Sequence, residues 1–77
     1  MHIKVMGSGC KNCKRLLERT QEAVTELGIE AEVEYVTDLD RIIDAGIMRT
    51  PGLVVDGKVV SMGRVPETEE IKSLLGQ

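Results

Sequence analysis

The fold is decided by residues 2–13, which read HIKVMGSGCKNC. The first part alternates polar and apolar side chains, with β-branched residues at apolar positions, and predicts a strand over residues 2–6. The glycines that follow end the strand in a turn. Two cysteines, Cys10 and Cys13, come next, at the predicted start of a helix. This segment therefore predicts a strand, a glycine-rich turn and a cysteine pair in direct succession, and the other elements are interpreted relative to it.

A long helix is predicted from about Lys11 to Leu27. Apolar or small side chains recur there at helical spacing, at Leu16, Leu17, Thr20, Ala23, Val24 and Leu27. Gly28 follows directly, and glycine is the residue type that most often ends a helix. Polar residues fill the other side, so the helix needs a partner layer that buries its apolar stripe.

The later elements are marked by equally local signals. They are a strand over residues 31–37, a short helix capped by Asp38 and ended by Gly46, strands over 53–55 and 58–62, and a helix from Pro66 to Gly76. Asp56-Gly57 between two β-branched runs is the strongest short signal for a hairpin. Pro66 suits the first position of a helix, and the glutamates after it face the positive end of the helix dipole.

The element order is therefore β-α-β-α-β-β-α within a single domain, residues 1–77. A strand–helix–strand unit implies a right-handed parallel pair, and the hairpin adds two antiparallel strands. We expect a four-stranded mixed sheet with the first strand in a central place and helices on both faces, which is a three-layer α/β sandwich. The first strand then brings residues 7–13 to the carboxyl edge of the sheet, where open α/β sheets bind their ligands.

The composition excludes several functions. Leu, Ile and Val number 22 against one aromatic residue, Tyr35, so there is no platform on which nucleic-acid bases would stack. No apolar run is long enough to span a membrane, and the alternating N-terminus is unlike a signal peptide. We expect a cytoplasmic monomer that binds neither membranes nor nucleic acid. Met48 and Met62 are interpreted as core residues.

The net charge of −3 conceals an asymmetry. Residues 1–19 carry five cations and one anion, residues 20–40 carry seven anions and no cation, and residues 41–77 are balanced at five each. The cysteines therefore lie in a basic segment of an acidic chain. Solvated helix faces are the commoner explanation of such runs.

The cysteine pair has the chemistry of a redox site. The N-terminus of a helix stabilises a thiolate through its unpaired N–H groups and its dipole, and the neighbouring cations Lys11 and Lys14 act in the same direction. We predict that Cys10 is the exposed nucleophile. Cys13, one turn into the helix, is predicted to be shielded and to act second, as the resolving cysteine.

These features together resemble the thioredoxin/glutaredoxin fold. More narrowly, the chain is similar to the small archaeal and bacterial thioredoxin-like redox-active disulfide proteins. The matching motifs are Gly-x-Gly-Cys-x-x-Cys at residues 7–13, Thr50-Pro51, Asp-Gly-Lys-Val-Val at 56–60 and Gly-Arg-Val-Pro at 63–66.

The resemblance implies an activity and a substrate site. It implies a thiol–disulfide oxidoreductase that exchanges electrons with protein disulfides through a mixed disulfide, with no cofactor beyond Cys10 and Cys13. The electrons would come from an external reductase or dithiol donor. The resemblance also implies that Pro51 is cis and lies against the cysteines, where the backbone of Thr50 would pair with an extended substrate segment.

The sequence departs from thioredoxins at several positions. Gly9 stands in place of the usual Trp, Lys11-Asn12 in place of Gly-Pro, and Lys4 in place of a buried acid. We interpret Lys4 as exposed and without a role. Arg49 and Arg64 stand where a glutaredoxin holds glutathione, and both are interpreted as surface charges rather than as a carboxylate site.

Two alternatives remain open. A metal-binding or metallochaperone module would use the two thiolates, but a zinc site usually needs four ligands and only His2 remains as a further candidate. We therefore expect no metal. A non-enzymatic binding domain would treat the cysteines as small buried apolar residues, which leaves their place among cations at a helix start unexplained.

Overall fold

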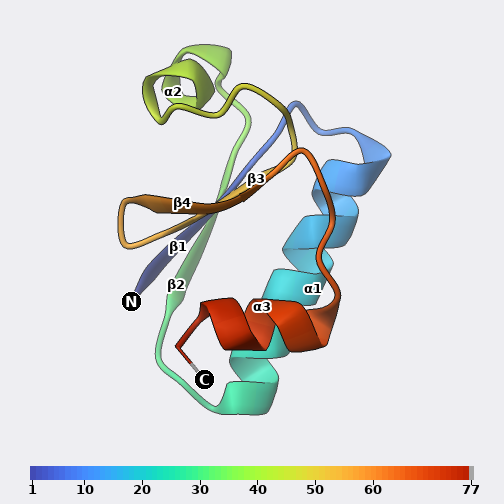
Figure 1. The fold of residues 1–77 in the computed structure, drawn as a ribbon, viewed down its shortest axis with the longest axis vertical. Helices are drawn as coiled ribbons and strands as arrows, with labels where there is room; N and C mark the ends of the chain where they lie inside the picture. Colours follow the sequence, from blue (N-terminus) through green and yellow to red (C-terminus); the bar gives the residue numbers. More distant parts are fainter. Residues whose placement is uncertain (77) are drawn as a thin grey trace.

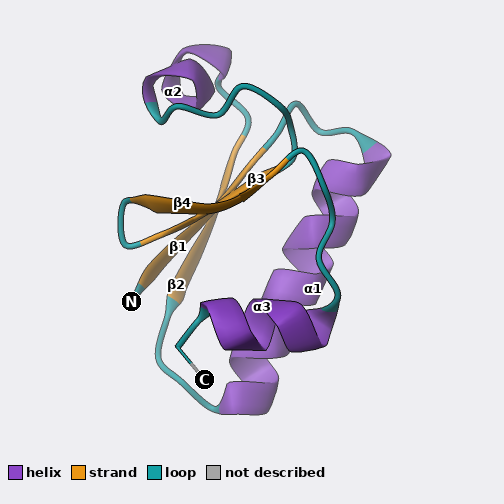
Figure 2. Cartoon of the chain, in the orientation of Figure 1, coloured by secondary structure: helices purple, strands orange, loops and turns teal. Residues whose placement is uncertain are grey.

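All seven predicted elements form, in the predicted order (Figures 1 and 2). The computed structural model describes residues 1–76, and Gln77, the last residue of the predicted domain, lies outside the described residues. The elements are β1 (His2–Met6), α1 (Lys11–Leu27), β2 (Glu32–Val36), α2 (Leu39–Asp44), β3 (Gly52–Val55), β4 (Lys58–Met62) and α3 (Thr68–Leu74). The second strand is one residue shorter at each end than the alternation predicts.

The four strands form one mixed sheet in the order β2-β1-β3-β4. β1 runs parallel to β2, with Ile3 beside Val33, and antiparallel to β3, with Val5 beside Leu53. β3 and β4 are antiparallel and form the terminal hairpin. The first strand is therefore central, as predicted.

Helices cover both faces of the sheet, but unequally (Figure 1). The larger core lies under α1 and α3 and consists of Ile3, Val5, Leu16, Ala23, Leu53, Ile71 and Leu75. The smaller core lies under α2 and consists of Met6, Val36, Ile42, Ile47 and Val54. The predicted three-layer sandwich is confirmed, and its third layer is a helix of only 6 residues over one end of the sheet.

Local signals end the helices and turn the chain where they were predicted to do so. Gly28 adopts a left-handed conformation (φ 65°), and its N–H donates to carbonyl groups at the end of α1. The Asp38 carboxylate accepts the N–H of Asp40 at 2.9 Å and so caps α2. In the hairpin turn both Asp56 (φ 50°) and Gly57 (φ 84°) have positive φ, as a type I′ turn requires.

The start of the last helix is corrected by the structure. α3 begins at Thr68 with Glu67 as its N-cap, so Pro66 is not its first residue. One Nη of Arg19 in α1 donates to the carbonyl oxygens of Val65 (3.3 Å) and Pro66 (3.1 Å). Because these carbonyls are bound by a distant arginine, residues 63–66 stay in a loop that crosses from β4 to α3.

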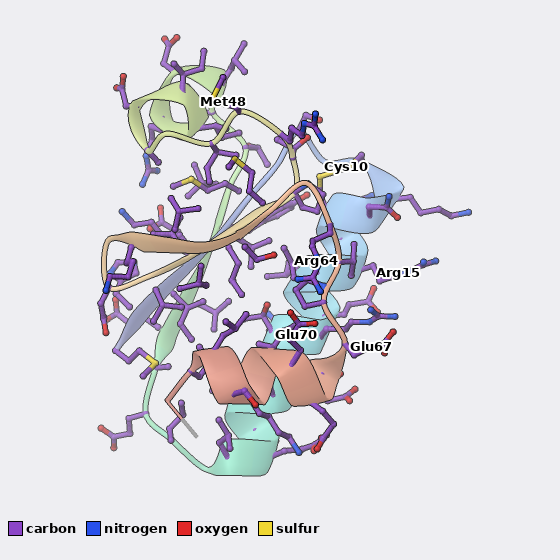
Figure 3. The ribbon with its side chains drawn as sticks, in the orientation of Figure 1. Cys10, Arg15, Met48, Arg64, Glu67 and Glu70 are labelled. Atoms are coloured by element: carbon purple, nitrogen blue, oxygen red, sulfur yellow. A yellow bond between two sulfur atoms is a disulfide. The ribbon has the colours of Figure 1, made fainter. Side chains whose placement is uncertain are left out.

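The interpretation of Met48 and Met62 as core residues is wrong. Met48 is 89% exposed and Met62 is 40% exposed. The short α2 covers little of its face of the sheet, and Ile42 and Ile47 already fill the space beneath it. The two methionines therefore lie outside, with the Sδ of Met62 accepting the N–H of Met48 at 3.2 Å. Figure 3 shows Met48 beside α2.

Candidate active site

Three loops meet at the carboxyl edge of β1. The register pairs Met6 with Gly52 and Gly52 with Met62, so the residues just beyond them lie side by side along this edge. They are Gly7 after β1, Pro51 before β3 and Gly63 after β4. The N–H of Gly63 donates to the carbonyl of Pro51 at 2.9 Å, which joins two of these loops directly.

Cys10 and Cys13 form a disulfide at the start of α1. Cys10 is the N-cap, with extended backbone angles (φ −71°, ψ 169°), and its Sγ accepts the N–H of Cys13 at 3.3 Å. The two Cα atoms are 5.1 Å apart, within the usual range for a disulfide. The helix start therefore holds both sulfurs together and supplies a hydrogen bond to the first.

The two cysteines differ sharply in exposure. Cys10 is exposed at the sheet edge (Figure 3), whereas Cys13 is 0% exposed. The structure therefore places these residues as the sequence predicted, with the first reachable by another molecule and the second shielded.

Gly7 is a part of this site that the sequence analysis missed. A Cβ built on Gly7 would lie 2.8 Å from the Cβ of Cys13 and closer still to its Sγ. Only glycine leaves room for the cysteine pair at this distance. The sequence offered a signal, a glycine directly before the motif, but it was interpreted only as a turn former.

The Thr50–Pro51 peptide bond is cis, the conformation that the resemblance implies. Pro51 is buried and Thr50 is exposed. Since Gly52 pairs with Met6, Pro51 lies beside Gly7, which itself packs on Cys13. The structure thus brings this predicted pair to the cysteines.

The predicted cations lie at the start of α1. Lys11 and Lys14 are both exposed, and the first turn of the helix contains no acidic residue. Lys4 lies elsewhere, because Ile3 and Val5 face α1 and Lys4 consequently faces the opposite side of the sheet. It is half-buried there rather than exposed.

Lys4 belongs to a charged group on the α2 face of the sheet. The pKa of Glu34 lies below its ordinary value, and the largest cause is a hydrogen bond from Arg41, followed by one from His2. The positive charge of Lys4 lowers this pKa further. His2 contacts Glu34 at 3.2 Å, at the far end of β1 from Cys10. These residues are not neighbours of the cysteines.

Arg49 and Arg64, at the positions where a glutaredoxin holds glutathione, differ in their contacts. Both Nη atoms of Arg64 donate to the carboxylate of Glu70, at 2.8 and 2.7 Å, which raises the pKa of Arg64 and lowers that of Glu70 (Figure 3). The guanidinium of Arg64 is therefore already paired with a carboxylate of the same chain. Arg49 is exposed, and its aliphatic stem lies against Gly63.

Known proteins with similar sequences identify the family. The family model for the thioredoxin domain matches residues 1–76. The chain belongs to the thioredoxin family. It is 49% identical over 75 residues to a thioredoxin of Methanothermobacter thermautotrophicus, with 97% of each chain covered. It is also 41% identical over 73 residues to a thioredoxin of Methanocaldococcus jannaschii, an overlap of 95% of this chain and 84% of that relative.

This member of the thioredoxin family is a thiol–disulfide oxidoreductase, and the Cys10–Cys13 disulfide is its redox centre. The predicted family, fold class and activity are confirmed. The metal-binding alternative gains no support from these relatives, and within residues 1–76 no three His, Cys, Asp or Glu side chains are grouped to hold a metal ion. Across the same residues no helix has both the length and the apolar composition needed to cross a bilayer.

Proposed function

We propose that Cys10 is the nucleophile and Cys13 the resolving cysteine of this thioredoxin-family enzyme. The difference in exposure supports this assignment, because a substrate disulfide has access to the exposed N-cap sulfur and not to the buried one. The Cys10 thiolate attacks one substrate sulfur, and the other leaves as a thiolate that takes up a proton. The Cys13 thiolate then attacks the Sγ of Cys10, closes the internal disulfide and releases the second substrate thiol. The substrate gains two electrons and two protons, which the protein dithiol loses.

The start of α1 is proposed to stabilise the Cys10 thiolate. Its Sγ already accepts a backbone N–H from the first turn, and a thiolate strengthens such a bond. Lys11 and Lys14 add positive charge in a turn that has no acidic residue. All these contributions favour the charged form of the sulfur.

Thr50 and Pro51 are proposed to bind the substrate. Pro51 beside Gly7 places the exposed Thr50 at the edge where Cys10 opens to solvent. An extended substrate segment pairing with the Thr50 backbone would lie across the cysteine pair, and such main-chain pairing is independent of the substrate side chains.

The partners follow from the reaction. We infer that the substrates are proteins with accessible disulfides and that an external reductase or dithiol donor returns two electrons per cycle to Cys10 and Cys13. No cofactor is needed for this exchange. A single domain over residues 1–77, a monomeric state and a cytoplasmic location complete the proposal.

Trapping of the mixed disulfide tests the roles of the cysteines. Cys13→Ser, mixed with a protein disulfide, is expected to accumulate a covalent adduct that runs larger on a non-reducing gel and disappears with dithiothreitol. Cys10→Ser is expected to form none. Adduct formation by Cys10→Ser but not by Cys13→Ser would reverse the roles, and adduct formation by neither variant would overturn the proposal.

A further inference from the structure

The lysines and arginines of this chain differ in whether they form ion pairs. Within residues 1–76, the arginines and lysines that form ion pairs are Arg19, Arg41, Arg64 and Lys72. Four exposed cations, on the first two turns of α1 and on the loop before Pro51, belong to no such pair among the described residues; they are Lys11, Lys14, Arg15 and Arg49, here called the basic rim. The other two cations without an ion pair among the described residues are the half-buried Lys4 and Lys58 at the distant hairpin. In a chain of net charge −3, most of the positive charge left available to another molecule therefore lies in the two segments that flank the disulfide.

The basic rim comes from two segments that the fold brings together. Its lysines and Arg15 lie in the first turns of α1, directly after Cys10. Arg49 precedes Thr50-Pro51, on the loop that lies beside Gly7 through the pairing of β3 with β1. α2, which carries Asp40 and Asp44, packs on the face of the sheet opposite to α1. A segment crossing the cysteine pair would therefore have cations on its α1 side and at the loop before Pro51.

Arg49 is held in place by a glycine. A Cβ on Gly63 would lie 3.0 Å from the Cβ of Arg49 and 3.2 Å from its Cδ, so the aliphatic stem of the arginine lies flat on this residue. The N–H of Gly63 bonds to Pro51, which fixes the same surface against the substrate-binding loop. The neighbouring Arg64 is bound in two places by Glu70, whereas Arg49 forms no ion pair within the described chain.

We propose that the basic rim selects disulfides flanked by acidic side chains, and that Arg49 is the specificity-determining residue. This inference rests on the proposed function, since it concerns the substrate of the same cysteines. Exposed ion pairs contribute little individually, but several charges of one sign at a site steer and orient an oppositely charged partner. The partner is therefore an acidic disulfide-containing segment of a protein.

Two matched peptides test the proposal. Both carry the same disulfide, flanked in one by two glutamates and in the other by two lysines, and reduced protein is mixed with each under single-turnover conditions. The wild type is expected to reduce the acidic peptide faster. Arg49→Gln is expected to lower this preference about fivefold, as for the loss of one or two exposed charge pairs. Lys58→Gln, which removes an exposed cation at the distant hairpin, should leave the preference unchanged.

Salt and charge reversal provide independent readouts. In 1 M NaCl the screening length falls to about 3 Å, so the wild-type preference is expected to collapse. Arg49→Glu should shift the preference toward the lysine peptide further than Arg49→Gln does. Circular dichroism confirms that each variant is folded, and a lower preference in Lys58→Gln equal to that in Arg49→Gln would contradict a local effect.

A neutral substrate separates the two proposals. If reduced wild-type protein reduces 2-hydroxyethyl disulfide and both peptides at equal rates, only the selection by the basic rim is overturned. If it reduces none of them, the proposed function fails. A preference that Arg49→Gln and Arg49→Glu both leave intact would remove Arg49 from its assigned role.

Discussion

Gly7 packs against Cys13 so closely that a Cβ on the glycine would lie 2.8 Å from the Cβ of the cysteine. This contact joins the end of the central strand to the first turn of α1. It fixes the depth at which the second sulfur is buried, and so contributes to the difference in exposure between the two cysteines.

Gly7→Ala is therefore expected to be destabilising. The added methyl group has to displace either the strand end or the helix start, and overpacking of this kind typically costs about 1–3 kcal/mol. Urea unfolding of the oxidised protein measures the loss. Ser8→Ala, at the exposed neighbouring position, should change the free energy of unfolding by less than about 0.5 kcal/mol. Equal stability of Gly7→Ala and the wild type would show that the contact relaxes without cost.

Arg19 anchors the loop between β4 and α3. It donates to the carbonyls of Val65 and Pro66 and lies 3.6 Å from the carboxylate of Glu67. Arg19→Met keeps the apolar stem but removes the guanidinium donor, and a loss of about 1.5–3 kcal/mol is expected from hydrogen bonds to a charged group. Faster amide exchange at the start of α3 should accompany the loss. Arg15→Met, which removes an exposed arginine from the same helix (Figure 3), should have little effect on either measurement.

Truncation of two neighbouring residues on the loop before β3 is expected to lower the stability by very different amounts. Ile47 is buried in the smaller core, and Ile47→Ala should lower the free energy of unfolding by about 2–5 kcal/mol. Met48 is exposed, so Met48→Ser should lower it by less than about 0.5 kcal/mol. Chemical denaturation of both variants tests this assignment. A comparable loss in Met48→Ser would show that its side chain is buried in solution.

These residues also show how far the sequence predicts the fold. The end of α1 at Gly28 and the turn at Asp56-Gly57 were predictable because each depends on the backbone preferences of the residues themselves. The start of α3 was not, because it depends on Arg19, far away in the chain. The exposure of Met48 was not predictable either, since it depends on how little of the sheet α2 covers.

Some features of the active site were likewise predictable from local sequence, whereas others depend on the folded structure. The chemistry of Cys10 and Cys13 follows from their place at a helix start, which is a local property. The cis bond before Pro51 was expected only through a family resemblance, because nothing in the adjacent residues specifies it. The fit of Gly7 to Cys13 arises only when α1 packs back on the sheet, so it depends on the folded structure.

Lys72 joins the two helices on the larger core. Its ammonium contacts the carboxylates of Glu26 in α1 and of Glu69 in its own helix, the latter at 2.8 Å. Both contacts raise the pKa of Lys72, and the hydrogen bond with Glu26 has the larger effect. In return, the hydrogen bond from Lys72 holds the pKa of Glu26 below 4.5.

The pH dependence of a Lys72→Met variant tests this pair. A carboxyl whose pKa is lowered on folding stabilises the protein above its unfolded pKa, and this contribution is lost as the pH falls through the folded value. Lys72→Met is therefore expected to be less stable than the wild type at pH 7, and the difference should shrink as the pH falls from 4.5 through the lower pKa that Glu26 has in the folded protein. Lys58→Met, which alters an exposed hairpin lysine, should show no such trend. A difference that stays constant between pH 7 and pH 3 would show that the ion pair between Lys72 and Glu26 is not its cause.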